Sequence, residues 1–113
     1  DEVFKIDKGT MKFPAEFMTI TFDMRDKWAE KAPAVAHVDG TARPQLVKKE
    51  VNPRYHALIS EYKKLTGLPL LINTSFNVHE EPIVMSPADA VASLTNGMLD
   101  VLVINDFIIT RTG

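Results

Sequence analysis

The sequence predicts an α/β or α+β fold, built as an open, twisted, mixed sheet with two main helices. Two segments carry helical signals, one from Asn52 to Gly67 and one from Ser86 to Gly97. Short apolar segments of strand length, such as residues 68–72 and 101–104, alternate with these helices. Strands that alternate with helices in this way are typical of a sheet that packs against helices.

The first helix begins at Asn52 and Pro53, because Asn is a good N-cap and Pro fits the first helical position. Gly67 supplies the left-handed C-cap. Apolar residues recur at helical spacing and predict a buried stripe, formed by Tyr55, Leu58, Ile59, Tyr62 and Leu65.

The second helix begins at Ser86, which is followed by Pro87 and, three residues after the serine, by Asp89. Its predicted buried stripe is Ala90, Val91, Leu94 and Met98. After this helix, residues 100–104 and 107–111 predict two strands of a hairpin, joined by a turn at Asn105-Asp106.

The N-terminal half has weaker signals. The first sixteen residues predict a short strand or an irregular lead-in, and residues 26–31 predict one helical turn. Alternation of apolar and polar residues over 18–23 predicts a half-buried strand. Three further segments predict strands or extended chain, and these are residues 34–39, 44–49 and 68–72.

Composition excludes several classes of protein. The 113 residues fit one domain, 1–113, and the absence of cysteine excludes disulfides, thiolate metal sites and a cysteine nucleophile. A net charge of −2 does not favour binding to nucleic acid, and no apolar run has the length of a membrane span. We therefore expect neither nucleic acid nor a membrane as a partner. We expect a cytoplasmic protein, and we expect this chain, which starts at Asp1, to be cut from a longer one.

Polar side chains follow two of the predicted strands. One segment is residues 37–45, which contains Asp39, Thr41 and Arg43, and the other is residues 73–77. Open sheets bind ligands at strand ends. A guanidinium binds phosphate through two parallel hydrogen bonds, and small hydroxyl and amide groups donate without bulk. The two segments together therefore indicate a phosphate or nucleotide pocket, although residues 73–77 also fit a purely structural turn.

Other candidates for chemistry stay open at this stage. His37 and Asp39 are metal ligands, an acid/base pair or hydrogen-bonded groups at a strand end. Trp28 stacks on an adenine or packs in the core, and residues 79–80 fit a solvated loop. The sequence contains no P-loop, no dinucleotide fingerprint and no recognisable serine nucleophile, and we expect no dedicated metal site.

Longer motifs add a family resemblance. Over about residues 15–110 the chain resembles the C-terminal domain of the NodU/CmcH-type carbamoyltransferase family, which includes nodulation proteins and antibiotic O-carbamoyltransferases. The most specific motifs are HVDGTARPQ at residues 37–45 and NTSFN at residues 73–77. The other matching blocks are residues 52–53, 66–69, 81–84 and 87–90.

The resemblance implies a YrdC-like fold, shortened here at the N-terminus, and a part in ATP-dependent O-carbamoyl transfer. Such a domain forms carbamoyl-adenylate from ATP and carbamoyl phosphate, with Mg²⁺ arriving on the ATP. An N-terminal actin-like domain of the same protein, which is an expected partner, then transfers the carbamoyl group to an acceptor hydroxyl. Apolar patches left bare by the shortening favour a homodimer.

The resemblance also implies roles for individual residues. Arg43 is expected to bind phosphate, and Ser75 and Asn77 match a Ser-x-Asn element that contacts the nucleotide phosphates or carbamoyl phosphate. These three are the expected catalytic residues. The expected substrate-binding residues are His37, Asp39, Thr41, Arg43, Thr74, Ser75 and Asn77.

Two departures from the family pattern matter. A Lys/Arg-rich stretch that precedes this region in the family is missing, so we expect the chain alone to bind ATP poorly and to be inactive. Glu80 stands where the family usually has Gly. Two alternatives also stay open: a domain like threonylcarbamoyl-adenylate synthases, and a non-catalytic domain that packs against the N-terminal domain.

Overall fold

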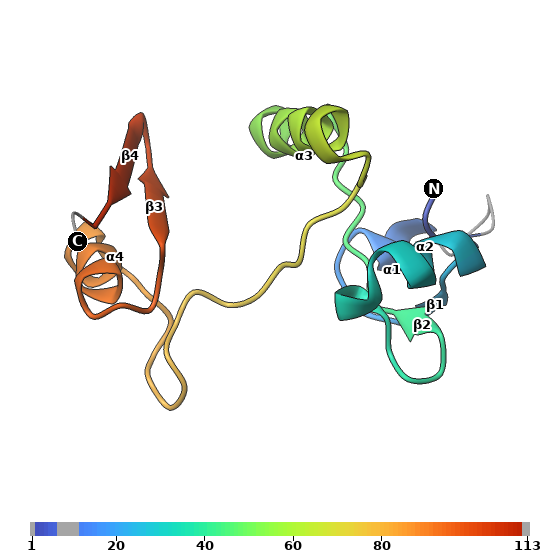
Figure 1. Ribbon diagram of the computed structural model, residues 1–113, viewed down its shortest axis with the longest axis horizontal. Helices are drawn as coiled ribbons and strands as arrows, with labels where there is room; N and C mark the ends of the chain where they lie inside the picture. The colour runs from blue at the N-terminus through green and yellow to red at the C-terminus, as the bar shows by residue number, and fades with distance from the viewer. Residues whose placement is uncertain (1, 7–11, 112–113) are drawn as a thin grey trace. The chain divides into compact units, whose positions relative to one another are not determined.

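The computed structural model describes residues 2–6 and 12–111 (Figure 1). The chain divides into two compact units, unit 1 (Asp1–Ile72) and unit 2 (Asn73–Gly113), and each unit has its own buried cluster. The α+β class is confirmed, because helices are combined with antiparallel strand pairs. Among the described residues the strands form two separate two-stranded sheets, β1–β2 and β3–β4, rather than the one open sheet that we expected.

Unit 1 contains most of the helices. Its elements are α1 (Lys12–Ala15), β1 (Phe22–Asp23), α2 (Asp26–Lys31), the 3₁₀ helix η1 (Pro33–Val35), β2 (Thr41–Ala42) and α3 (Pro53–Thr66). Unit 2 contains α4 (Pro87–Thr95), β3 (Val101–Ile104) and β4 (Phe107–Thr110).

The core of unit 1 is built around Trp28, whose side chain is 5% exposed and packs with Val3, Met24 and Ala42. The indole N–H donates to the carbonyl of Glu2 at 2.9 Å, so the polar edge of this buried ring has a partner. Trp28 is therefore a core residue, which excludes the alternative that it stacks on an adenine.

The short β1–β2 pair sets which side chains of unit 1 face outward. Its register pairs Phe22 with Ala42 and Asp23 with Thr41. Phe22 and Ala42 are both buried. Successive side chains of a strand point to opposite faces, so Asp23 and Thr41 lie on the side away from the core.

Several strand predictions for unit 1 were wrong. Residues 34–39 form the end of η1 and a turn, because Pro33 starts a 3₁₀ helix and the chain reverses at Gly40. Only Phe22–Asp23 of the segment 18–23 forms a strand. Residues 68–72 pair with no strand among the described residues. Leu68 and Leu70 instead pack, partly buried, against the Trp28 cluster.

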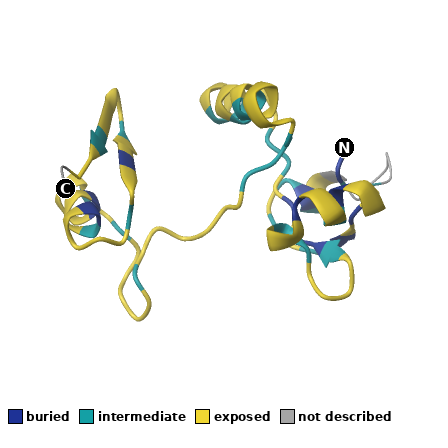
Figure 2. Ribbon diagram, in the orientation of Figure 1, coloured by how far each residue is buried: buried dark blue, intermediate teal, exposed yellow. Residues whose placement is uncertain are grey.

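Both ends of α3 follow the prediction. The side-chain oxygen of Asn52 accepts from the backbone N–H of Tyr55 at 3.2 Å, and Gly67 has the left-handed φ of 77°. The predicted buried stripe is wrong, because no described residue of α3 is buried and Leu65 is 85% exposed (Figure 2). Capping signals are local, whereas burial depends on a neighbouring surface that the helix itself does not specify.

Unit 2 packs α4 against the β3–β4 hairpin. Ala90 and Leu94 of α4 are buried with Leu102 of β3, as predicted for the first two, whereas Val91 and Met98 are exposed. The hairpin itself is confirmed, and Asn105 takes the positive φ of 51° in its turn.

The N-terminus of α4 has a capping box. Ser86 Oγ accepts from the N–H of Asp89 at 3.2 Å, and the Asp89 carboxylate accepts from the N–H of Ser86 at 3.0 Å. The bond to Ser86 and a further bond from the N–H of Met85 lower the pKa of Asp89. The stabilisation from this carboxylate is therefore fully present above the ordinary pKa of the group and is lost as the pH falls through the lowered pKa of the folded chain.

We expect Ser86→Ala to destabilise α4 by about 1 kcal/mol, because the N–H of Asp89 loses its acceptor. Amide hydrogen exchange over residues 89–95 measures this local opening. Ser86→Asp is the matched control, since it keeps an acceptor oxygen and should retain most of the protection. Equal protection in the unaltered chain and in Ser86→Ala would contradict the capping role.

Candidate functional site

The first candidate segment forms a tight turn that leads into β2. The backbone N–H of Gly40 donates to the carbonyl of His37 at 3.0 Å, and the N–H of His37 donates to the carbonyl of Thr41 at 2.7 Å. Gly40 takes a positive φ of 78° at the reversal, which glycine adopts without steric strain. The turn therefore holds the two ends of the segment 37–41 against each other.

Three side chains of this turn are hydrogen-bonded in series. The Thr41 hydroxyl donates to Asp39 Oδ1 at 2.8 Å, and His37 Nδ1 lies 3.0 Å from the same hydroxyl oxygen. The backbone N–H of Thr41 also donates to Asp39 Oδ1, at 3.0 Å. The hydroxyl bond first, then the backbone bond, and also the nearby His37, lower the pKa of Asp39. Asp39 is therefore an acceptor at neutral pH.

Arg43 follows β2 and is exposed. Its neighbours Ala42 and Pro44 are both buried, so Arg43 lies on the side away from the core, as Thr41 does. The guanidinium has no ion-pair or hydrogen-bond partner among residues 2–6 and 12–111. It is therefore available to an anion on the outward face of β2.

The second candidate segment, residues 73–77, lies in unit 2. Thr74 and Ser75 are exposed, and neither hydroxyl has a partner within the described part of the chain. Both hydroxyls are therefore free to donate to a ligand. His79 and Glu81 are exposed as well.

Asn77 differs from Ser75 because its side-chain amide nitrogen already donates hydrogen bonds within the loop. Asn77 Nδ2 donates to the carbonyls of Val78 and Glu81, each at 3.0 Å. Two backbone bonds close the same loop, from Glu81 to Val78 at 3.1 Å and from Val84 to Phe76 at 2.8 Å. Asn77 thus holds the loop formed by residues 76–84, which is the structural role that the sequence left open for this segment.

Glu80 lies at the tip of this loop with a φ of 67°. An L-residue other than Asn or Asp is strained in this region, whereas Gly is not. Gly at position 80 would therefore adopt this backbone conformation without the strain that Glu80 carries.

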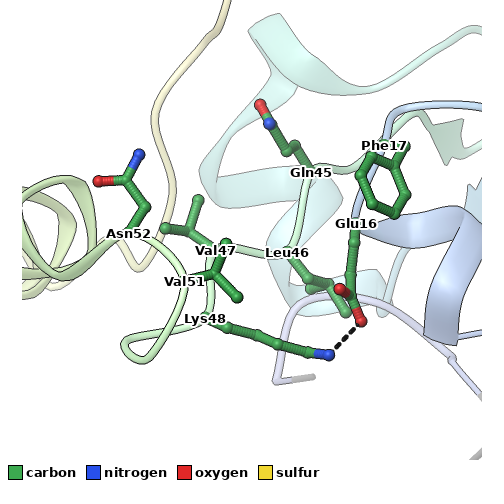
Figure 3. A pocket seen from close by; sticks show the side chains of 8 residues that line it. All are labelled: Glu16, Phe17, Gln45, Leu46, Val47, Lys48, Val51 and Asn52. Carbon is green, nitrogen blue, oxygen red and sulfur yellow. Dashed lines mark ion pairs between the residues drawn. The ribbon is translucent and has the colours of Figure 1, made fainter.

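A small pocket of about 160 Å³ lies elsewhere in unit 1 (Figure 3). Its wall includes the ion pair between Lys48 and Glu16, whose atoms are 2.5 Å apart. Its lining residues are Glu16, Phe17, Gln45, Leu46, Val47, Lys48, Val51 and Asn52. None of the expected catalytic or substrate-binding residues lines it, and its two charged groups neutralise each other.

Neither a metal-binding cluster nor a membrane-spanning helix is present among the described residues. Among residues 2–6 and 12–111, no three His, Asp or Glu side chains gather in a way that could bind a metal ion. No helix within the same residues is both long and apolar enough to cross a membrane.

Sequence reasoning named the residues of the turn but missed their hydrogen-bonded series and the bracing role of Asn77. The first had a signal, because Asp-Gly-Thr is a good sequence for a turn in which the Asp side chain accepts from the backbone two residues later. The bracing role of Asn77 had no sequence signal beyond the presence of an amide, because its hydrogen bonds depend on the path of the loop from Val78 to Glu81.

Comparison with known proteins places the chain in a family. Residues 1–111 match the family described as the carbamoyltransferase C-terminus. The nodulation protein NolO of Bradyrhizobium diazoefficiens is 41% identical over 110 residues, which is 97% of this chain and 20% of that protein. NolNO of Sinorhizobium fredii is 40% identical over 111 residues, which is 98% of this chain and 16% of that protein.

A third relative is nodulation protein U of Rhizobium tropici, 37% identical over 98 residues, which is 87% of this chain and 16% of that protein. The chain belongs to the carbamoyltransferase C-terminus family. It spans only 16–20% of the length of these three relatives.

We expect Asn77→Ala to loosen the 76–84 loop by about 1–3 kcal/mol, because two hydrogen bonds of about 0.5–1.5 kcal/mol each are lost. Faster amide exchange at Glu81 and Val84 measures the effect. Thr74→Ala is the control, since Thr74 has no partner among the described residues, and it should leave both amides protected. Undiminished protection in Asn77→Ala would show that the amide does not hold the loop.

Replacement of Glu80 separates backbone strain from charge. Glu80→Gly should stabilise the loop by roughly 1 kcal/mol, because a β-carbon at this φ is strained. Glu80→Ala removes the carboxylate but keeps the β-carbon, so it should give no such gain. The same two amide exchange rates report the difference, and an equal gain in both variants would assign the effect to charge instead.

Proposed function

We propose that this chain forms the ATP- and carbamoyl phosphate-binding part of an ATP-dependent O-carbamoyltransferase. In this proposal the site produces carbamoyl-adenylate, and an actin-like domain of the same protein transfers the carbamoyl group to an acceptor hydroxyl. Membership of the carbamoyltransferase C-terminus family supports the reaction class. The chain alone, which spans a small part of its relatives, is proposed to be inactive.

The observation that carries the proposal is the outward face of β2. Burial of Ala42 in the Trp28 cluster directs Thr41 and Arg43 to the opposite side, where Arg43 has no partner within the described residues. An exposed planar guanidinium that has no protein partner can bind two oxygens of a phosphate through two parallel hydrogen bonds. Arg43 is accordingly proposed as the phosphate-binding residue.

The distribution of charge along the chain favours Arg43 as a source of positive charge for a phosphate ligand. Residues 73–113 contain five acidic side chains and one basic side chain, Arg111. Segment 73–77 itself contains no charged residue, so it offers hydroxyl and amide groups but no positive charge. Within this chain the positive charge for a phosphate ligand therefore comes mainly from residues 1–72.

Unit 2 is proposed to orient the ligand through Ser75 and Thr74. Their hydroxyls have no partner among the described residues and can donate to phosphoryl oxygens. The nitrogen of the Asn77 amide is used in the loop, so we assign it the task of holding that loop. Its amide oxygen is the group that suits the N–H₂ of a carbamoyl group.

The chemistry needs positioning and charge neutralisation more than a protein nucleophile. A carbamate oxygen attacks the α-phosphorus of ATP, and the bond from that phosphorus to pyrophosphate breaks. Negative charge grows on the phosphoryl oxygens during this step, so a guanidinium and hydroxyl donors placed around them lower the barrier. Mg²⁺ enters with ATP as part of the substrate.

We expect Arg43→Ala in the full-length protein to weaken binding of carbamoyl phosphate or ATP at least tenfold. Removal of a charged hydrogen-bond partner typically costs about 1.5–3 kcal/mol, and 1.4 kcal/mol corresponds to a factor of ten. Isothermal titration calorimetry measures both affinities. Arg43→Lys should recover only part of the loss, because it keeps the charge but not the planar fork.

Arg54→Ala is the matched control, since it removes an exposed arginine of α3 outside the proposed site. Equal affinities in Arg43→Ala and the unaltered protein would contradict the assignment. Pyrophosphate release with carbamoyl phosphate, compared with release with threonine and bicarbonate, tests the substrate. Turnover only with threonine and bicarbonate would replace the proposed reaction with threonylcarbamoyl-adenylate synthesis.

A further inference from the structure

The series of hydrogen bonds in the 37–41 turn fixes where the protons are. Asp39 is ionised at neutral pH, so its Oδ1 accepts from both the hydroxyl and the backbone N–H of Thr41. A hydroxyl has one proton, and that of Thr41 is used in the 2.8 Å bond to Asp39. The Thr41 oxygen therefore acts as acceptor toward His37 Nδ1 at 3.0 Å, and Nδ1 carries the hydrogen.

The other nitrogen of this imidazole then has a defined state. With Nδ1 protonated, the neutral ring has an unprotonated Nε2 with a free lone pair. His37 is exposed, so Nε2 is accessible to a ligand or to water. If Nε2 takes a proton, the positive ring remains bonded through Nδ1–H to Thr41 and, through Thr41, to the carboxylate of Asp39.

This arrangement resembles the way in which a carboxylate orients and stabilises a catalytic imidazole in a triad, with one hydroxyl inserted between them. Asp39 lies in the same turn as His37, Asp23 is paired with Thr41 in the β1–β2 register, and Arg43 follows β2.

We propose that His37 is the general base for hydrolysis of carbamoyl phosphate, with Thr41 and Asp39 as its positioning residues. This role rests on the proposed function, because carbamate must be released from carbamoyl phosphate before it attacks ATP. Arg43, two residues beyond Thr41 on the same outward side, would bind the phosphate end of the same molecule.

The proposed hydrolysis transfers one proton from water to the leaving phosphate by way of His37. The water oxygen bonds to the carbamoyl carbon while one water proton passes to Nε2 of His37. The bond between that carbon and the phosphate oxygen breaks, and the imidazolium returns its proton to the leaving phosphate. The products are hydrogen phosphate and carbamic acid, which gives its remaining acidic proton to solvent and becomes carbamate. No redox reagent is needed.

Kinetics of the full-length protein test the role directly. Phosphate release from carbamoyl phosphate in the presence of ATP gives kcat and KM, and calorimetry gives the affinity for carbamoyl phosphate. General base catalysis typically contributes 10²–10⁴-fold, so we expect His37→Gln to lower kcat by about 100-fold or more. Affinity should change by less than about threefold, because a proton-transfer group acts on the transition state rather than on binding.

Thr41 variants separate positioning from folding. Thr41→Val removes the hydroxyl but keeps the shape, so kcat should fall about tenfold or more, whereas Thr41→Ser keeps the hydroxyl and should recover most of the turnover. Nitrogen-15 NMR of the histidine rings in the 113-residue chain gives a second readout. Nδ1 of His37 should be the protonated nitrogen in the unaltered chain and in Thr41→Ser, and this preference should be lost in Thr41→Val.

The outcomes are distinguishable. Full turnover in His37→Gln, equal damage in Thr41→Ser and Thr41→Val, or an Nε2-protonated His37 in the unaltered chain would each overturn the general base role. If His37→Gln retains full turnover and the protein still binds carbamoyl phosphate, the proposed function is unaffected. Absence of carbamoyl phosphate binding in the unaltered full-length protein would overturn the proposed function and, with it, the role of His37.

Discussion

Burial of Ala42 is the constraint on which the candidate chemistry of unit 1 depends. The methyl group packs with Trp28, Met24 and Val3, and this contact fixes which face of β2 points inward. Thr41 and Arg43, on either side of Ala42, then lie on the other face. Thr41 is hydrogen-bonded to His37 in the turn, whereas Arg43 has no partner among the described residues. A small residue is required at this position, because a larger side chain would shift β2 and both outward groups with it.

Unit 2 positions its candidate residues through hydrogen bonds rather than through a large core. Only Ala90, Leu94 and Leu102 are buried in its cluster, and the loop that follows Ser75 is held by the Asn77 amide and by backbone bonds. Each bond contributes about 0.5–1.5 kcal/mol, so the loop is held by few interactions. Its hydroxyl groups are accordingly free to adjust to a ligand, whereas the guanidinium of unit 1 extends from a strand anchored in a core.

Structural features that depend on residues close in the sequence were predicted well, and features that depend on distant residues were not. The caps of α3 and α4 were predicted from Asn52 and Ser86, because a cap depends on residues within one helical turn. Residues 34–39 and 68–72 were predicted as strands from their apolar runs, yet such runs do not distinguish a strand from a segment that packs irregularly on a core. Within the 37–45 motif, His37, Asp39 and Thr41 are linked by hydrogen bonds, and the order of these bonds depends on the observed turn.

We propose that residues 37–43 and residues 73–77 each contact a phosphate-containing ligand. Hydrogen exchange of the full-length protein, followed by mass spectrometry with and without ATP and carbamoyl phosphate, measures this most directly. We expect peptides covering both segments to gain protection over the same range of ligand concentration. Protection confined to one segment, or found only around the Glu16–Lys48 pocket, would contradict it.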